Sequence, residues 1–211
     1  HHVTDEGYLP SVFPFLAAIA VRTPTIRVGT AVLLAPFHHP IRLAEDAAFV
    51  DQLSGGRLDL GLGLGYRRDE FRALDVPRAE RGTRTEELIE IARRAWTGEP
   101  FSHRGTHWQL ADVVVTPPPA QAGGPPLWLG GATAKAAERA GRLGCHFMPD
   151  ACMPVEHHAV AHRPRPQDVA GQAAVRRFGE QDVGGRVHIR PVVGDQLVGC
   201  HVDLQAIGEV L

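Results

Sequence analysis

The stretch that most constrains the fold runs from residue 26 to residue 66 and reads IRVGTAVLLAPFHHPIRLAEDAAFVDQLSGGRLDLGLGLGY. Its apolar pattern predicts a strand over Ile26–Leu34 and a second strand over Leu58–Leu64, which carries its leucines on one face. Between them the spacing predicts a helix that begins at Pro40, where a first helical turn tolerates proline. The helix is expected to end at Gly55, which suits a left-handed C-cap. Two strands joined by such a helix run parallel and cross over right-handedly.

The second strand presents Asp59, Gly61 and Gly63 on the face opposite its leucines, and Gly65 follows at its end. Ligands of parallel α/β folds collect at the carboxyl ends of the strands. We therefore expect this face, which is nearly free of side chains, to leave room for a flat ligand to approach the backbone.

Composition limits the classes of function. The chain has 211 residues, of which 44% are hydrophobic, and a formal charge of −2. It therefore fits a globular protein without the basic face that a nucleic-acid partner would need, and no apolar run approaches the roughly 20 residues that span a bilayer. Cys145, Cys152 and Cys200 lack paired metal-type spacing, which indicates reduced thiols and a cytoplasmic location. We predict no metal, nucleic-acid or membrane partner.

Strands and helices alternate along the rest of the chain. Thr83 and Glu86 have the spacing of a capping box, ahead of a helix whose apolar face holds Leu88, Ile91, Ala92 and Ala95. The other expected elements are a helix at Phe13–Val21, a helical turn at Arg67–Ala73, a loop at Val76–Gly82, a hairpin at Phe101–Leu110, a strand at Val113–Thr116, a connector at Pro117–Pro126, a strand at PLWLGG, a helix capped by Thr133 and a strand at Cys145–Pro149. This alternation over residues 26–149 is typical of a parallel α/β fold.

The character of the chain changes near its end. Residues 150–211 show no sustained helical or strand periodicity, so we predict a divergent tail without a native fold, separate from a folded domain at residues 1–149. His157, His158 and His162 lie close together in the tail. No carboxylate or cysteine joins them at ligand spacing on a recognisable helix, so we do not assign a metal site.

Two sets of residues are candidates for chemistry. Gly130–Thr133 follows a strand and opens a helix, where free backbone N–H groups and the helix dipole attract anions. An ordinary strand-to-helix turn is the alternative, although the second glycine-rich strand end favours a phosphate site. His1 and His2 could move a proton near neutral pH or be solvated surface, and His38 and His39 are expected to shape a loop.

Several segments together resemble a known family. They are HHVTDEGYLPS, IRVGTAVLLAPFHHPIRLAED, DQLSGGRLDLGLGLGYRRDEF, AWTGEPFSHRG and PPLWLGGATAKAAERAGRLG, and they cover residues 1–149 in order. This region resembles the bacterial luciferase-like, flavin-dependent monooxygenases and oxidoreductases. Members are (β/α)8 TIM barrels that hold FMN, or the related deazaflavin coenzyme, at the carboxyl end of the barrel. The resemblance implies a partial barrel domain in which the four expected strands correspond to strands three to six.

The resemblance also implies roles for individual residues. The family's third strand ends in a bulge with a non-prolyl cis peptide that supports the isoalloxazine ring, and Ala31-Val32 is the matching pair. His2 matches a histidine near the reactive ring edge and is the expected proton donor or acceptor. Gly131 lies in the matching phosphate turn and is expected to face the ligand rather than the core. The expected cofactor-binding residues are Thr30, Ala31, Val32, Gly63, Gly65, Tyr66, Gly130, Gly131, Ala132 and Thr133.

The implied activity is that of an oxidoreductase or monooxygenase acting on paired donors. Reduced FMN would support oxygen insertion into a small organic substrate or hydride transfer to it, and a deazaflavin would support hydride transfer only. A separate flavin reductase is the implied partner, and a homo-oligomer is left open. Two alternatives remain: a non-catalytic flavin-binding relic or truncated fragment, and an unrelated phosphate-binding barrel enzyme. For the tail, a shifted reading frame is one hypothesis.

Overall fold

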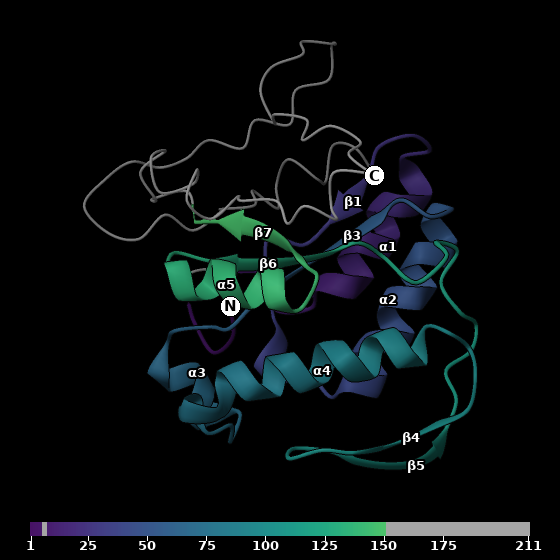
Figure 1. Cartoon of the computed structure of the whole chain (residues 1–211). Coiled ribbons are helices and arrows are strands. Elements are labelled where there is room, and N and C mark those ends of the chain that lie inside the picture. Colours follow the sequence, from purple (N-terminus) through teal and green to yellow (C-terminus); the bar gives the residue numbers. More distant parts are fainter. Residues whose placement is uncertain (6–7, 151–211) are drawn as a thin grey trace. The chain divides into compact units, whose positions relative to one another are not determined.

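The computed structural model describes residues 1–5 and 8–150 (Figure 1). Contacts divide the chain into two compact units. The described residues of the first unit are 1–5 and 8–10, and those of the second are 11–150. The predicted tail and its three histidines lie outside the described residues, so the proposed division at residue 149 stays a prediction.

A parallel sheet organises the second unit. Its strands pair in the order β1, β3, β6, β7, and β2 also pairs with β3. Every one of these pairings is parallel, which confirms the predicted parallel arrangement, although the strand expected over Ile26–Leu34 is split into two short strands. The strands are β1 (Val28–Gly29), β2 (Leu33–Leu34), β3 (Leu58–Gly63), β6 (Leu127–Gly131) and β7 (His146–Pro149).

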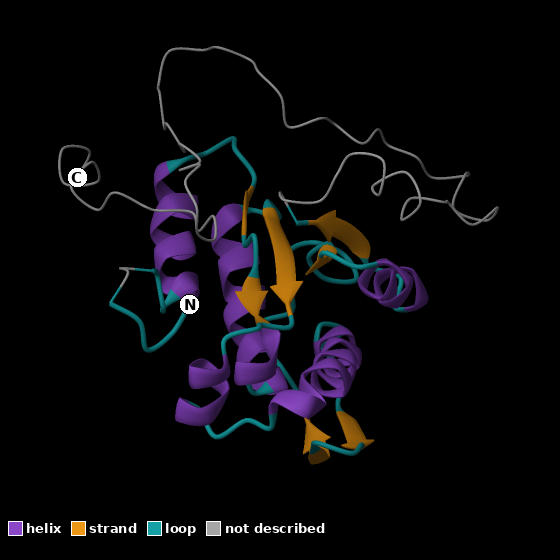
Figure 2. Cartoon of the chain, turned by 90° about the vertical axis from the view of Figure 1, so that its left-hand side faces the viewer, coloured by secondary structure: helices purple, strands orange, loops and turns teal. Residues whose placement is uncertain are grey.

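Helices connect these strands and pack beside them (Figure 2). Helix α2 packs against β3, α1 packs against α2, and α5 packs against β6 and β7. The helical elements are α1 (Val12–Arg22), η1 (Ala35–Phe37), α2 (Pro40–Ser54), α3 (Arg68–Ala73), η2 (Arg78–Glu80), α4 (Arg81–Ala95) and α5 (Ala134–Arg142). The alternation of parallel strands and helices is that of consecutive units of a (β/α)8 barrel.

Helix α2 ends and begins where the sequence predicts. Pro40 occupies its first position, and the Nδ1 atom of His39 accepts a hydrogen bond from the Ile41 N–H at 3.3 Å. Gly55 closes the helix with φ of 66°, a left-handed conformation that glycine adopts without steric cost. His39 therefore shapes the loop before the helix, as expected.

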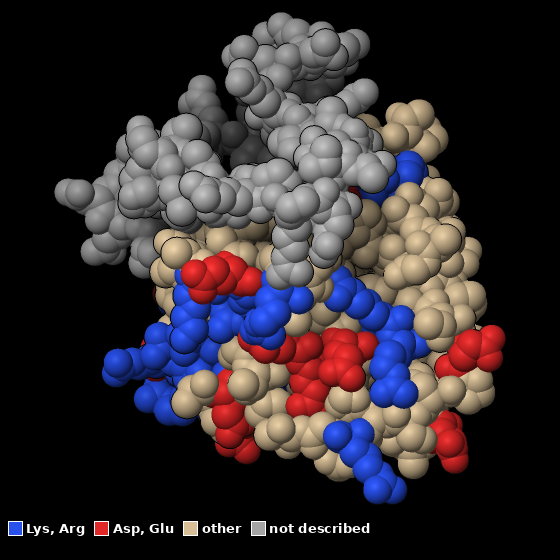
Figure 3. All heavy atoms as spheres, viewed as in Figure 1, with Lys and Arg blue, Asp and Glu red and all other residues tan. Residues whose placement is uncertain are grey.

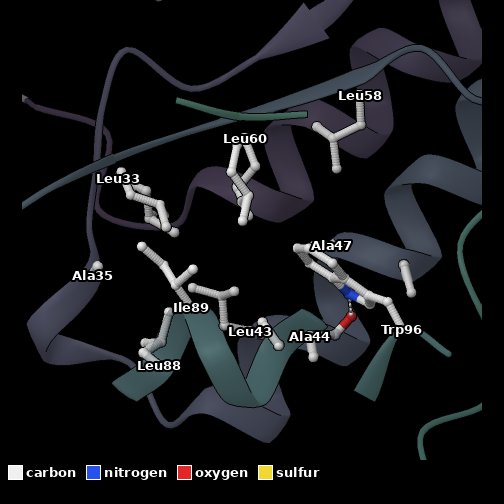
Figure 4. Packing of buried hydrophobic residues seen from close by; sticks show 14 of the residues in the cluster. Leu33, Ala35, Leu43, Ala44, Ala47, Leu58, Leu60, Leu88, Ile89 and Trp96 are labelled. Carbon is white, nitrogen blue, oxygen red and sulfur yellow. Dashed lines mark hydrogen bonds between the residues drawn. The ribbon is translucent and has the colours of Figure 1, made fainter. Parts of the chain in front are cut away.

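The hydrophobic core lies between the sheet and the helices α1, α2 and α4 (Figure 4). Leu58, Leu60 and Leu62 of β3 are at most 1% exposed. Full burial of one leucine contributes about 1.5–3 kcal/mol, so these three side chains anchor β3 firmly. Trp96 is part of this core and packs beside α2, where its Nε1–H donates to the carbonyl oxygen of Ala44 at 3.0 Å.

The region between α4 and β6 differs partly from its prediction. The expected hairpin is present as β4 (Phe101–Arg104) and β5 (Gln109–Val113), which pair antiparallel. The separate strand predicted from Val113 is wrong, because Val113 is already the last residue of β5 and pairs with Phe101. The chain then enters the prolines at residues 117–119, which lack N–H donors for a ladder.

The predicted capping box of α4 is also wrong. The helix begins at Arg81, directly after the short helix η2, so Thr83 lies inside its first turn. The Thr83 hydroxyl donates to the carbonyl oxygen of Glu80 at 3.0 Å. Glu86, which the motif would have used as a cap, instead contacts α5. The loop expected over Val76–Gly82 is partly helical, because it contains η2 and the first residues of α4.

Candidate active site

A bulge separates β1 from β2 and forms the first part of the candidate site. Gly29 pairs with Asp59 and Leu33 with Leu62, so four residue steps on one strand oppose three on its neighbour. One extra residue in a parallel pairing of this kind makes a bulge. The Ala31-Val32 peptide within it is cis, which confirms the pair that the family resemblance indicated.

Thr30 fixes the bulge to β3. Its side chain is buried, and its hydroxyl donates to the carbonyl oxygen of Gly61 at 2.6 Å. Its backbone N–H donates to the carbonyl oxygen of Asp59 at 3.3 Å. Ala31 by contrast is exposed and Val32 is half-buried. The bulge is therefore anchored at one end and presents its next two residues outward.

Three glycines of β3 and β6 make room for this bulge. A Cβ atom on Gly61 would lie closer than 3.0 Å to the carbonyl oxygen of Thr30, and one on Gly63 would lie equally close to the side chain of Val32. A Cβ atom on Gly130 would lie 2.9 Å from Val32 Cγ1. The space expected to admit a flat ligand above Gly61 and Gly63 is thus filled by the protein itself. That expectation was wrong, because Thr30 and Val32 of the bulge lie directly over these glycines. Direct contact of Gly63 with a cofactor stays a prediction.

Gly65 and Tyr66 follow the carboxyl end of β3. Gly65 has φ of 73°, which turns the chain toward α3, and its α-carbon faces the ring of Phe71. Tyr66 is 50% exposed. Val32 of the bulge therefore lies against Gly63 of β3 and Gly130 of β6. Gly65 and Tyr66 lie in the turn that follows β3.

The turn between β6 and α5 leads into a capped helix. The Thr133 hydroxyl accepts a hydrogen bond from the Ala136 N–H at 3.2 Å and caps the helix. Residues Ala132–Lys135 are exposed. The first N–H groups of a helix have no partner within the helix, so this end of α5 presents donors to its surroundings.

Gly131 does not face outward with this turn. A Cβ atom at this position would lie closer than 3.0 Å to the Cβ atom of Ala136 and 3.8 Å from the ring of Phe147. The expectation that Gly131 faces a ligand and not the core is therefore wrong. Helix α5 returns over the end of β6, and glycine is needed because the two approach closely.

Glu86 of α4 holds α5 in place. One of its carboxylate oxygens accepts hydrogen bonds from Arg139 Nε at 2.8 Å and from Arg142 Nη2 at 2.7 Å. The hydrogen bond from Arg142 is the largest influence on this carboxyl and, together with Arg139, lowers its pKa below the usual range despite partial burial. Two ion pairs thus hold α5 against α4.

A second carboxylate of α4 anchors the β4–β5 hairpin. Glu87 accepts hydrogen bonds from the backbone N–H groups of Thr106, His107 and Trp108 at 2.9–3.3 Å, and its Oε1 lies 3.1 Å from His103 Nε2. Burial alone would raise the pKa of Glu87, but these hydrogen bonds outweigh it and lower the pKa. No local sequence signal pointed to this role, because the partners are distant in the chain.

His2 belongs to the first compact unit, where the ring of His1 packs edge-on against Tyr8 with 4.8 Å between centroids. The role of His2 as a proton donor or acceptor stays a prediction. Among the described residues, no cluster of three histidine, cysteine or carboxylate side chains could hold a metal ion. Within the same part of the chain, every helix is too short or too polar to cross a membrane.

Comparisons with known proteins agree with this geometry. A family model described as luciferase-like monooxygenase matches residues 1–195. The chain belongs to this family. The oxygenase component of the flavin-dependent trigonelline monooxygenase of Acinetobacter baylyi is 34% identical over 149 residues, which cover 69% of this chain and 41% of that protein. The F420-dependent glucose-6-phosphate dehydrogenase of Microbacterium testaceum is 33% identical over 142 residues, which cover 66% of this chain and 42% of that protein.

A solved monooxygenase has a similar fold. The crystal structure of the monooxygenase RslO1 from Streptomyces bottropensis matches with a TM-score of 0.64 and 37% identity, over 67% of this chain and 44% of that chain. The luciferase-like, TIM-barrel type of fold predicted from the sequence is thereby confirmed, and the alternative of an unrelated phosphate-binding barrel is excluded. The chain spans about two fifths of the length of the curated relatives described above.

Proposed function

We propose that the protein is an oxidoreductase that uses reduced FMN, or a deazaflavin such as F420, to act on a small organic substrate. The observation that carries this proposal is the bulge of Ala31 and Val32 beside the close-packed glycines Gly63 and Gly130. A flat ring needs a surface without flexible side chains, and this arrangement offers one at the carboxyl ends of adjacent strands. Ligands of such folds bind at that end of the sheet.

The protein's own residues would bind and orient the cofactor. Ala31 and Val32 would support one face of the ring, and backbone N–H groups of the exposed residues Ala132–Lys135 would bind its phosphate. Lys135 adds positive charge near that turn without being required. When bound, the flavin supplies the hydride or the electrons that activate oxygen, and a deazaflavin supplies the hydride alone.

Proton transfer would fall to His2. Imidazole titrates near neutral pH, so it can donate or accept a proton during turnover. The family relation supports this assignment through the matching N-terminal segment. We also propose a separate flavin reductase as the source of reduced FMN and a cytoplasmic location, with homo-oligomerisation left open.

The two cofactors correspond to two reactions. The relative named as a flavin-dependent monooxygenase supports oxygen insertion with paired donors, and the relative named as an F420-dependent dehydrogenase supports hydride transfer. A flavin-binding relic without turnover is the remaining alternative, because the chain spans only part of the length of these relatives.

Binding and turnover separate these possibilities. The purified chain is mixed with FMN or F420, freed of excess ligand and examined for the absorbance of the bound cofactor. We expect one of the two to remain bound, and oxygen consumption or F420 oxidation to follow when a reductase or a reduced cofactor is supplied. Retention without turnover would indicate the relic. Failure to bind either cofactor would refute the proposed function.

A further inference from the structure

A second candidate binding site lies beside the carboxyl end of β3. A hollow of about 490 Å³ opens between α3 and η2, which is within the range of about 300–1,000 Å³ that small-molecule sites occupy. Figure 2 shows the strands of the sheet pointing toward the side of the molecule where α3 lies. The hollow therefore belongs to the same end of the sheet as the bulge and the phosphate turn.

The rim of this hollow is basic. Arg68, Arg72 and Arg78 line it, and Asp75 is the only carboxylate among its lining residues. Basic side chains gather on the left of Figure 3, over the region where Figure 1 places α3 and α5. Three guanidinium groups around one opening attract an anion and can bind a planar carboxylate through paired hydrogen bonds.

Two of these arginines are available to a ligand. Arg72 pairs with Asp69 at 2.8 Å, and both side chains are largely exposed. In the described part of the chain, no carboxylate lies within ion-pair distance of Arg68 or Arg78. Arginines on this protein elsewhere pair closely, as Arg139 and Arg142 do with Glu86. Arg68 and Arg78 are thus the two described guanidinium groups of the rim that no ion pair neutralises.

The lining between the arginines is apolar. Phe71, Val76 and Pro77 contribute to it. The ring of Phe71 is only 3% exposed and packs edge-on against Phe37, with 4.7 Å between centroids. It also lies against Gly65, where a Cβ atom would be 3.3 Å from Phe71 Cε2. Phe71 therefore connects the hollow with the turn that follows β3 in the candidate active site.

We propose that this hollow binds an organic acid whose carboxylate pairs with Arg68 and Arg78 while its flat apolar body lies against Phe71 and Val76. A ligand that is only charged would leave the apolar lining unused, and a neutral one would leave two guanidinium groups without a partner. As a statement about the substrate, the inference rests on the proposed function. The binding itself does not depend on it.

Benzoate is a suitable probe because it combines a carboxylate with a flat apolar ring. Its affinity for the whole chain is measured by calorimetry beside that of benzyl alcohol, which lacks the charge, and acetate, which lacks the ring. We expect saturable binding of benzoate and at least tenfold weaker binding of both comparison ligands. Comparable affinities for benzoate and either comparison ligand, or no saturable benzoate binding, would overturn the proposal.

Matched variants locate the site. The double variant Arg68→Gln/Arg78→Gln should bind benzoate at least tenfold more weakly, and Arg42→Gln, which removes one exposed charge on α2, should bind it as the unchanged protein does. Both variants should keep the circular dichroism of the parent, because the replaced side chains are exposed. Equal benzoate affinity in the double variant would overturn the assignment.

FMN and F420 binding, measured on the same samples, separates this inference from the proposed function. Benzoate binding that depends on Arg68 and Arg78, without binding of either cofactor, would support the organic-acid site and refute the flavin assignment. Cofactor binding without benzoate binding would refute the organic-acid site and leave the flavin assignment standing.

Discussion

Substitution of Gly131 by alanine tests the close approach of α5 to the end of β6. The added methyl group would lie closer than 3.0 Å to the Cβ atom of Ala136, a separation that two carbon atoms do not tolerate without movement. Either α5 must shift outward or β6 must bend. Extra methyl groups in a well-packed region typically cost about 1–3 kcal/mol.

The backbone fixes the position of an alanine methyl group, so the contact with Ala136 is relieved only if β6 or α5 moves. The distance of 3.8 Å to the ring of Phe147 is an ordinary van der Waals contact. We therefore expect Gly131→Ala to lower the free energy of unfolding by roughly 2 kcal/mol. For a chain of this length that corresponds to a fall in Tm of about 4–8 °C, measured by circular dichroism and checked by urea unfolding.

Gly141 provides a control within the same helix. A Cβ atom there meets no other atom within 4 Å, and alanine favours the helix over glycine by roughly 0.5–1 kcal/mol. Gly141→Ala should therefore leave the Tm unchanged or raise it slightly. If Gly131→Ala is as stable as Gly141→Ala, the close contact between β6 and α5 is not present and the reasoning fails.

Three further outcomes follow from the site. Ala132→Asp, at an exposed position of the phosphate turn, should weaken FMN binding at least about a hundredfold through charge repulsion with little effect on riboflavin; equal losses for both would remove the phosphate assignment. His2→Ala should slow turnover by about a hundredfold or more while cofactor binding is kept; an unchanged rate would show that His2 does not transfer the proton. Glu87→Gln should lower stability by about 1–3 kcal/mol at pH 7, since it removes the charge from a partly buried acceptor. Because the pKa of Glu87 is lowered in the folded state, its stabilisation is present above the unfolded-state pKa of about 4.3 and is lost as the pH falls through the folded value. Urea unfolding of both proteins should therefore differ less below pH 4 than at pH 7, and a constant difference would contradict this role.

The sequence by itself determined the elements whose signals are local. Pro40 and Gly55 mark the two ends of α2, and the Thr133 cap marks the start of α5, because each acts on backbone groups within four residues of itself. The leucines of β3 likewise predicted a strand with one buried face. Parallel pairing followed from the helix between the strands, and the family resemblance supplied the cis peptide at Ala31-Val32.

Only the tertiary structure decided what the glycines are for. Gly61 and Gly63 were expected to leave room for a flat ligand, whereas the carbonyl oxygen of Thr30 and the side chain of Val32 occupy the space above them. Gly131 was expected to face the ligand, whereas Ala136 of the returning helix lies against it. A glycine in the sequence indicates that another group approaches the backbone there, but the sequence does not say whether that group is a ligand or another part of the chain.

Tertiary packing also decided the partners of the charged residues of α4. Glu86 had the spacing of a capping residue, yet its partners are Arg139 and Arg142, more than 50 residues away. Glu87 binds the turn of the hairpin some 20 residues later. Because a carboxylate accepts hydrogen bonds from whichever donors the fold brings to it, its partner depends on the packing of elements that are distant in the sequence.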